Sequence, residues 1–372
     1  MMRPGKANAQ VEEASALTPT PPITGIPPNG SNRPWNRGGG ATGFWAALGP
    51  KAYLFSVALL VMLVGFILSP YFLTSRNLVS MLITASVVSI LAVGQFMVIV
   101  TGGIDLSVGS VAALSSVVSA LALQQGMPTA VAVLVGLGVG GLIGLFNGAL
   151  IVYGGITPFI VTLAMMSVAR GIAYLIQSGR FVPIDDAAFF SVLNGYLGPI
   201  PTPVLLALLV MVVAAITLAF MPFGRRLYAI GGNPEAARLS GLPVKRDVMK
   251  AYVLSSSFAG LGGMMIAAQL TEGSAIIGHE YELNSIAAVV VGGASLFGGS
   301  GDPVSAVVGG LIIGMILNIM DLLGIQAQTQ LIVKGAVILL AVLFTTGRGR
   351  QGVARIFKAL RSPRSTRSTA TP

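Results

Sequence analysis

Two short segments of this chain carry polar residues in patterns that suggest a mechanism, and both interrupt long apolar stretches. The first is segment 101–110, TGGIDLSVGS, in which two glycines precede Asp105 and Ser107. We expect a break in the apolar stretch, after which Asp105 caps the free N–H groups of a following helix, with Ser107 one turn inside it. The segment is either a capped turn between two helices or a broken segment beside a pathway.

The second segment, residues 222–250, contains the signals of a short helix that is bounded on both sides. Asn233 is a favourable N-cap residue, Pro234 suits the first helical turn, and Glu235 stands where the helix dipole favours an acid. Gly241 ends the helix, and Pro243 prevents its continuation. The segment therefore predicts a helix of about two turns that lies parallel to a membrane.

The surface of this short helix allows two interpretations. Ala236, Ala237 and Leu239 are compact and apolar, which suits insertion into a groove of another protein. Arg238 and the neighbouring basic residues would instead hold the helix against lipid headgroups. The residue types support both interpretations equally.

The rest of the chain offers little for catalysis. It has no Cys, a single His (His279), and no phosphate-binding loop of the G-x-x-x-x-G-K-[ST] type. We therefore predict no catalytic residues, no metal site and no nucleotide bound by this chain. Most ionisable residues near the apolar stretches lie at their ends, and only Arg170 falls near the middle of one. Arg170 is either a pathway or gating residue or a structural partner.

Charged residues are scarce in the chain as a whole, as expected for a membrane protein. Apolar residues make up 54% of the chain, charged residues 9%, and the mean hydropathy is +0.85, against about 25% charged residues in soluble domains. The chain also has 48 glycines, which serve close helix contacts in membranes. The sequence predicts an all-α polytopic membrane protein. Polar residues within its apolar stretches are interhelical hydrogen-bonding groups or pathway contacts: Gln95, Asn147, Thr162, Ser167 and Asn318.

Ten apolar segments approach the length that a hydrocarbon layer of about 30 Å requires. They are 52–69, 79–100, 106–124, 129–153, 158–177, 203–221, 251–270, 283–298, 304–320 and 329–346. The glycine-rich stretches near 100–110 and 283–310 are candidates for half-spans or re-entrant segments. The predicted membrane domain, 51–347, is flanked by a Pro-rich tail at 1–50 and a basic tail at 348–372, both predicted to be disordered.

Basic residues set the orientation of these spans. Most of the 22 Lys and Arg residues lie in residues 1–51, 222–250 and 348–372. An even number of spans places all three segments, and both termini, in the cytoplasm. The loop 271–282, which has three acids and no Lys or Arg, would lie on the opposite side. These topology signals explain the net charge of +10 without nucleic-acid binding.

The sequence also contains a faint internal repeat. Segment 140–147 resembles 309–318, and segment 100–103 resembles 291–293. With ten spans, spans 2–5 and 7–10 would run in opposite senses, as in the inverted repeats of transporters.

At segments 101–110 and 231–241 the sequence resembles the permease subunits of ATP-binding-cassette (ABC) importers, most closely those of the ribose/xylose/arabinose type. The matching features are GGIDLSVGS, segment 147–170 with ITPFIVTL and SVARG, and segment 287–301 with its paired glycines. The E-A-A-x-x-x-G motif of a coupling segment is formed by Glu235, Ala236, Ala237 and Gly241. The resemblance covers roughly residues 52–347 and leaves the Pro-rich tail outside.

This resemblance implies a multi-pass protein of the bacterial inner membrane that carries a monosaccharide such as ribose, xylose, arabinose or galactose and is not an enzyme. Two permease copies would form the pathway, a partner chain would bind ATP and Mg, and a periplasmic sugar-binding protein would deliver the cargo. The residues that the resemblance implies for coupling to the ATPase are Asn233, Glu235, Ala236, Ala237, Arg238 and Gly241. The pathway and gating candidates are Gln95, Asp105, Ser107, Asn147, Thr162, Ser167, Arg170 and Asn318.

Two alternatives remain open. Related importer permeases carry branched-chain amino acids or nucleosides. An autonomous secondary carrier would need an ion site of its own, which unwound backbone carbonyls can supply.

Overall fold

The structure is a computed structural model that describes residues 49–345. The helices are α2 (Gly49–Leu68), α3 (Ser75–Ile99), α4 (Val108–Gln124), α5 (Thr129–Val152), α6 (Pro158–Gln177), α7 (Ala187–Asn194), α8 (Thr202–Phe220), α9 (Pro222–Gly232), α10 (Pro234–Leu239), α11 (Val244–Leu270), α12 (Tyr281–Val291), α13 (Pro303–Leu322) and α14 (Ala327–Thr345). Strand β1 (Val182–Pro183) pairs with β4 (Glu272–Gly273), and β2 (Tyr196–Leu197) pairs with β3 (Ile200–Pro201), both antiparallel. The predicted tails, except for the first two residues of α2, lie outside the described residues.

Each predicted apolar segment contains a helix. Six helices of the described chain are long and apolar enough to cross a membrane, namely α3, α5, α6, α8, α11 and α13. Shorter apolar helices occupy the other four predicted segments. The prediction of an all-α polytopic protein is therefore confirmed.

Two predicted boundaries are wrong, for different physical reasons. Helix α11 begins at Val244 rather than at 251, because hydropathy marks the membrane layer and not the end of a helix that extends beyond it. Helix α12 stops at Val291, whereas a span was predicted over 283–298. Gly293 takes a φ of +88°, a left-handed conformation that ends a helix.

The core of the bundle is built around α3 and α11. Helix α5 packs antiparallel to α11 through glycines at four-residue spacing, so that a Cβ added at Gly144 would lie 2.4 Å from the Tyr252 carbonyl oxygen. Helix α13 packs antiparallel to α3 in the same way, with Gly310 against Ser89 and Gly314 against Ala85. Small residues let the helix backbones approach closely, which is the usual source of packing energy in a membrane.

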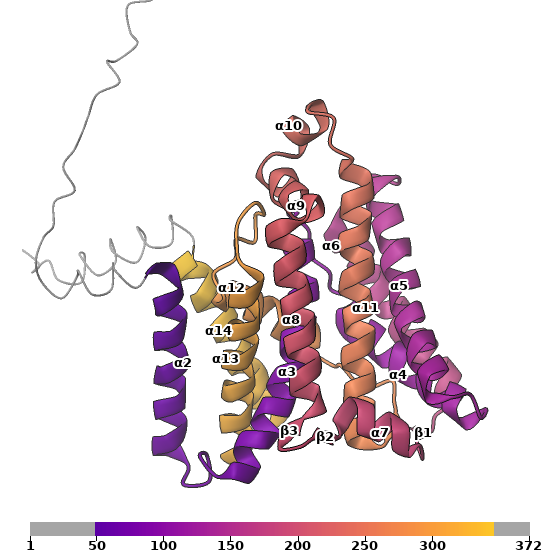
Figure 1. Ribbon diagram of the computed structural model, residues 1–372, viewed down its shortest axis with the longest axis vertical. Coiled ribbons are helices and arrows are strands. Elements are labelled where there is room, and N and C mark those ends of the chain that lie inside the picture. The colour runs from indigo at the N-terminus through magenta and orange to yellow at the C-terminus, as the bar shows by residue number, and fades with distance from the viewer. Residues whose placement is uncertain (1–48, 346–372) are drawn as a thin grey trace, which may run out of the picture. The chain divides into compact units, whose positions relative to one another are not determined.

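Figure 1 shows α9 and α10 at one end of this bundle and α7 with the short strands at the other. We call these the α10 end and the α7 end. The first residues of α2 and the last residues of α14 lie toward the α10 end (Figure 1).

Two non-helical segments enter the bundle. Residues 100–107 link α3 to α4, as the paired glycines predict. Residues 271–280 start at β4 and run antiparallel to α4, since Gly273 lies against Ser116 and Gly278 against Gly109. The loop predicted over 271–282 is thus non-helical over residues 271–280, although much of it is buried, and its last two residues belong to α12.

One acid of this re-entrant segment, Glu280, is paired with a cation of α14. The Glu280 carboxylate accepts a hydrogen bond of 2.6 Å from the ammonium of Lys334 in α14, and both side chains are largely buried. The local sequence does not reveal this ion pair, because Lys334 lies 54 residues farther along the chain than Glu280.

Candidate coupling segment and intramembrane polar cluster

The short helix predicted between residues 233 and 241 is present as α10. Asn233 caps it, with the Oδ1 atom accepting a hydrogen bond of 2.9 Å from the Ala236 N–H group. Pro234 is the first helical residue, as predicted. Gly241 takes a φ of +77°, which an L residue rarely adopts, and Pro243 directly precedes α11. Local capping chemistry thus fixes both ends of α10.

The outer surface of α10 is charged and accessible. The Arg238 guanidinium donates hydrogen bonds of 3.0 and 2.6 Å to the carboxylate oxygens of Glu235, and this pairing holds the pKa of Glu235 below its usual value. Leu239 is 74% exposed. Ala237 instead is buried, so the predicted apolar face is wrong at that residue. The surface that α10 offers to a partner consists of Glu235, Ala236, Arg238 and Leu239.

Helix α9 anchors α10 to the bundle. Leu227 and Ile230 are buried on its inner face. Arg226 forms an ion pair with Asp247 at the start of α11, whose side chain is fully buried. The Tyr228 hydroxyl donates a hydrogen bond of 3.1 Å to the Gly301 carbonyl oxygen. These contacts join α9 to α11 and to the loop before α13.

The closest contact of α9 is made by Gly231. A Cβ at this residue would lie 1.8 Å from the Val100 carbonyl oxygen and 2.5 Å from the Gly299 nitrogen. The Gly299 N–H group also donates a hydrogen bond of 2.9 Å to that Val100 oxygen. Three stretches of backbone therefore meet here without side chains between them. They belong to α9, the end of α3 and loop 292–302.

A second constellation of polar residues lies inside the bundle around Asp105. The Asp105 side chain is fully buried, and its Oδ1 atom accepts hydrogen bonds from the Ser107 N–H group at 2.9 Å and the Ser107 hydroxyl at 2.6 Å. Its Oδ2 atom accepts from the hydroxyls of Ser255 and Ser256 in α11 at 3.3 and 3.4 Å. Asp105 is thus an interior residue and not one at the end of a span, which corrects the prediction.

The capping role predicted for Asp105 is also wrong in detail. Ser107 itself occupies the N-cap position of α4, so it is not one turn inside the helix, and its side chain makes no capping hydrogen bond. The Asp105 carboxylate fixes the turn before the helix and connects it to α11.

Three further predicted residues join or border this cluster. Oriented so that both ends of its amide are paired, Gln95 donates to the Asp105 carbonyl oxygen at 3.0 Å and accepts from the Asp105 N–H group at 3.2 Å. The Asn147 amide donates to the Ser107 hydroxyl at 3.0 Å. The Thr162 hydroxyl contacts the Ile104 carbonyl oxygen at 3.3 Å. Side chains of α3, α5, α6 and α11 therefore meet the non-helical segment 100–107 around Asp105.

The remaining candidates lie elsewhere. Ser167 is exposed on α6. Arg170 donates hydrogen bonds of 2.5 and 2.7 Å to the carbonyl oxygens of Ala275 and Ile277 in the re-entrant segment. Asn318 exchanges two amide hydrogen bonds, of 2.9 and 2.8 Å, with Asn77 in α3. Arg170 and Asn318 therefore make hydrogen bonds within the described chain, away from the Asp105 cluster.

Sequence reasoning missed Ser255 and Ser256. A usable signal was present, because three consecutive serines, 255–257, stand within an otherwise apolar span. The arrangement around Asp105 is a hydrogen-bonding network of buried side chains. Within residues 49–345, no group of three or more His, Asp or Glu side chains is placed to hold a metal ion.

Comparison with known proteins places this fold in a family. Residues 77–342 match the family described as the permease component of branched-chain amino acid transport systems. The chain belongs to this family. The permease is 41% identical over 305 residues to the ribose import permease protein RbsC of Bacillus subtilis, covering 81% of this chain and 93% of the relative.

Two other similar proteins are named for sugars other than ribose. The D-allose transport system permease protein AlsC of Escherichia coli is 36% identical over 300 residues, covering 80% of this permease and 91% of the relative. The L-arabinose ABC transporter permease protein AraH of Azospirillum brasilense is 36% identical over 282 residues, with coverages of 76% and 83%. No solved structure matches this chain. The predicted resemblance to ABC importer permeases is confirmed: the chain is a non-catalytic, multi-pass membrane subunit.

Proposed function

We propose that this permease forms the membrane pathway of a binding-protein-dependent importer for a monosaccharide of the ribose, allose or arabinose kind. The observation that carries the proposal is that relatives named for these three sugars align with three quarters or more of the chain.

The α10 end is the proposed docking site of the ATPase. An exposed, capped helix with a charged outer surface suits insertion into a cleft of a partner protein. ATP and Mg would be bound by that partner, because this chain has no phosphate-binding loop. With ten passes, the α10 end and both termini face the cytoplasm, and a sugar-binding protein docks at the α7 end.

The close backbone contact at Gly231 would transmit a movement of α10 to the rest of the bundle. Closure of the ATPase would displace α10 and, through α9, the backbones of Val100 and Gly299. Val100 ends α3, and Gly299 lies in the loop that begins α13. A second permease copy would complete the pathway, as a homodimer, with Gln95, Asp105, Ser107 and Asn147 as the interior network that responds to the motion.

A second cargo class has a specific observation in its favour. The matching family is described by branched-chain amino acid transport, so an amino acid is the alternative within the same importer class. A secondary carrier, which would transport without any ATPase, is the alternative outside it.

Reconstitution tests these possibilities together. The permease is placed in liposomes with the ATPase and binding protein that co-purify with it, and uptake of D-ribose, D-allose, L-arabinose and L-leucine is measured with and without ATP. We expect ATP-dependent uptake of one sugar, and we expect Glu235→Arg to abolish it. Uptake of leucine would identify the amino-acid alternative, and uptake without ATP would refute the importer.

A further inference from the structure

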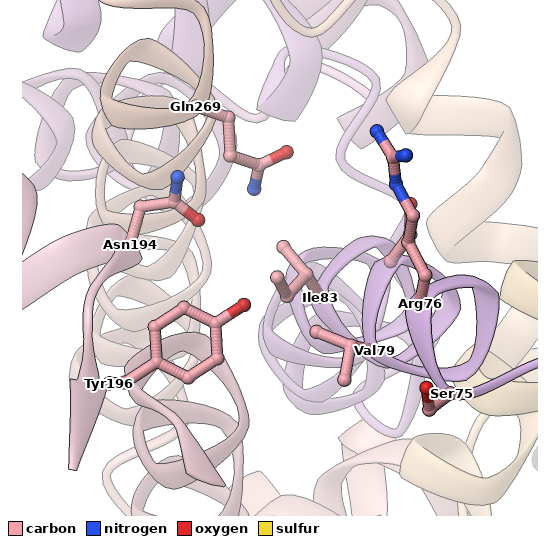
Figure 2. A pocket seen from close by; sticks show the side chains of 8 residues that line it. Ser75, Arg76, Val79, Ile83, Asn194, Tyr196 and Gln269 are labelled. Atoms are coloured by element: carbon pink, nitrogen blue, oxygen red, sulfur yellow. The ribbon is translucent and has the colours of Figure 1, made fainter. Parts of the chain in front are cut away.

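A cavity opens at the α7 end, between the two central helices and the short strands. Its volume is about 440 Å³, and its walls come from the first turns of α3, the end of α7, β2 and the last turn of α11. Figure 2 shows Asn194, Tyr196 and Gln269 on one side of the space, facing Val79, Ile83 and Arg76 on the other. The cavity is separate from the Asp105 cluster, although both use α3 and α11.

The two amides in this cavity have polar atoms without partners. The Oδ1 atom of Asn194 and the Nε2 atom of Gln269 are shielded from solvent and make no hydrogen bond within the described chain. Both amides point into the cavity from the same side (Figure 2). Buried polar atoms are nearly always paired in folded proteins, so an unpaired acceptor beside an unpaired donor is typical of a site that a polar ligand completes.

The other lining residues define the chemistry of that ligand. Arg76 is exposed and adds donors opposite the amides. The Tyr196 ring and the Val79 and Ile83 side chains offer apolar surface. No carboxylate lines the cavity, so the ammonium group of an amino acid would find no counter-charge there.

We propose that this cavity binds a neutral monosaccharide at the entrance to the permease. Sugar hydroxyls both donate and accept hydrogen bonds, as Asn194, Gln269 and Arg76 require, and the C–H face of a sugar ring packs against an aromatic ring. The volume lies in the range of small-molecule sites, about 300–1,000 Å³, and is ample for one sugar. The inference rests on the proposed function and specifies where the cargo first contacts this chain.

The chain has no native cysteine, which allows a direct binding measurement on the assembled transporter. Ser80 lines the cavity and is exposed, so Ser80→Cys introduces one thiol there. The rate of its modification by a membrane-impermeant methanethiosulfonate is measured with increasing D-ribose, D-allose or L-arabinose. Occupancy should slow the rate by a factor of one plus the ratio of sugar concentration to Kd, about elevenfold at ten times Kd.

Ser191→Cys is the matched control, because Ser191 is exposed on α7 at the same end but does not line the cavity. We expect sugar to leave its modification rate unchanged. Three results would overturn the proposal: no sugar slows Ser80→Cys, sugar slows both variants equally, or L-leucine protects as well as sugar does.

A transport measurement separates this inference from the proposed function. Asn194→Ala and Gln269→Ala should each lower sugar uptake about threefold to tenfold, the loss expected for one hydrogen bond. Native uptake in both would refute the cavity while leaving the importer intact. Failure of the native transporter to take up any sugar would refute the proposed function itself.

Discussion

Replacing Gly231 by alanine tests whether the route from α10 to the bundle is a rigid contact. The added Cβ would lie 1.8 Å from the Val100 carbonyl oxygen, far inside the normal separation of about 3.5 Å. The obstructing atoms belong to backbone, not to a side chain that can rotate away. Helix α9 and the end of α3 must therefore separate by more than about 1 Å.

The magnitude follows from two contributions. Overpacking of this kind costs about 1–3 kcal/mol, and the hydrogen bond between Gly299 and Val100, which spans the same point, contributes about 0.5–1.5 kcal/mol. We expect Gly231→Ala to lower the free energy of unfolding by about 1.5–4.5 kcal/mol in total. The neighbouring Gly232 provides the control, since a Cβ there meets no atom within 4 Å.

Two assays read out this comparison. Unfolding of the purified permease in detergent measures stability, and sugar uptake per ATP hydrolysed in liposomes measures coupling. Gly231→Ala should lower both, with the larger effect on uptake per ATP, whereas Gly232→Ala should behave as the native protein. Equal behaviour of the two variants in both assays would refute the idea that close backbone contact carries the motion.

Three other substitutions test separate parts of the structure. Gly241→Pro should abolish uptake while the permease still inserts, because proline cannot adopt the φ of +77° found there; normal uptake would contradict the assignment of α10 as the coupling helix. Asp105→Ala should lower the free energy of unfolding by about 2–4 kcal/mol, since it leaves buried hydroxyls and an N–H group unpaired, and Asp105→Asn should cost less; an unchanged thermal transition in Asp105→Ala would count against the network. Arg170→Gln should speed hydrogen exchange over residues 271–280 by freeing the Ala275 and Ile277 carbonyl groups, and unchanged exchange would show that other contacts hold the segment.

The features that the sequence predicted well depend on local chemistry. Helix α10 follows from Asn233, Pro234 and Gly241, all within nine residues, because capping is decided by neighbours in the chain. The positions of the apolar helices follow from hydropathy, since the bilayer requires a minimum apolar length.

The features that it missed depend on distant partners. Asp105 was placed at the end of a span, yet the break at 100–107 returns it to the interior beside Ser255, 150 residues away. The ion pair between Glu280 and Lys334 was also missed, because the two residues stand 54 positions apart in the chain. The cavity at the α7 end joins residues from α3, α7, β2 and α11, a combination that no single stretch of sequence displays.

Hydrogen bonds between α6 and the re-entrant segment, residues 271–280, determine which parts of the permease can move as one body. Ala275 is clamped at both of its backbone groups: Gln177 accepts from its N–H at 2.7 Å, and Arg170 donates to its carbonyl oxygen. These two side chains stand two helical turns apart on α6, about 10 Å, so the segment cannot slide along that helix. Helix α6 and residues 271–280 should therefore travel together. Beyond α12, Gly293, Gly298, Gly299 and Gly301 of loop 292–302 all adopt positive φ, and a bend in this loop would let that body move relative to α13. Because the loop also contacts Gly231, a displacement of α10 would reach it directly.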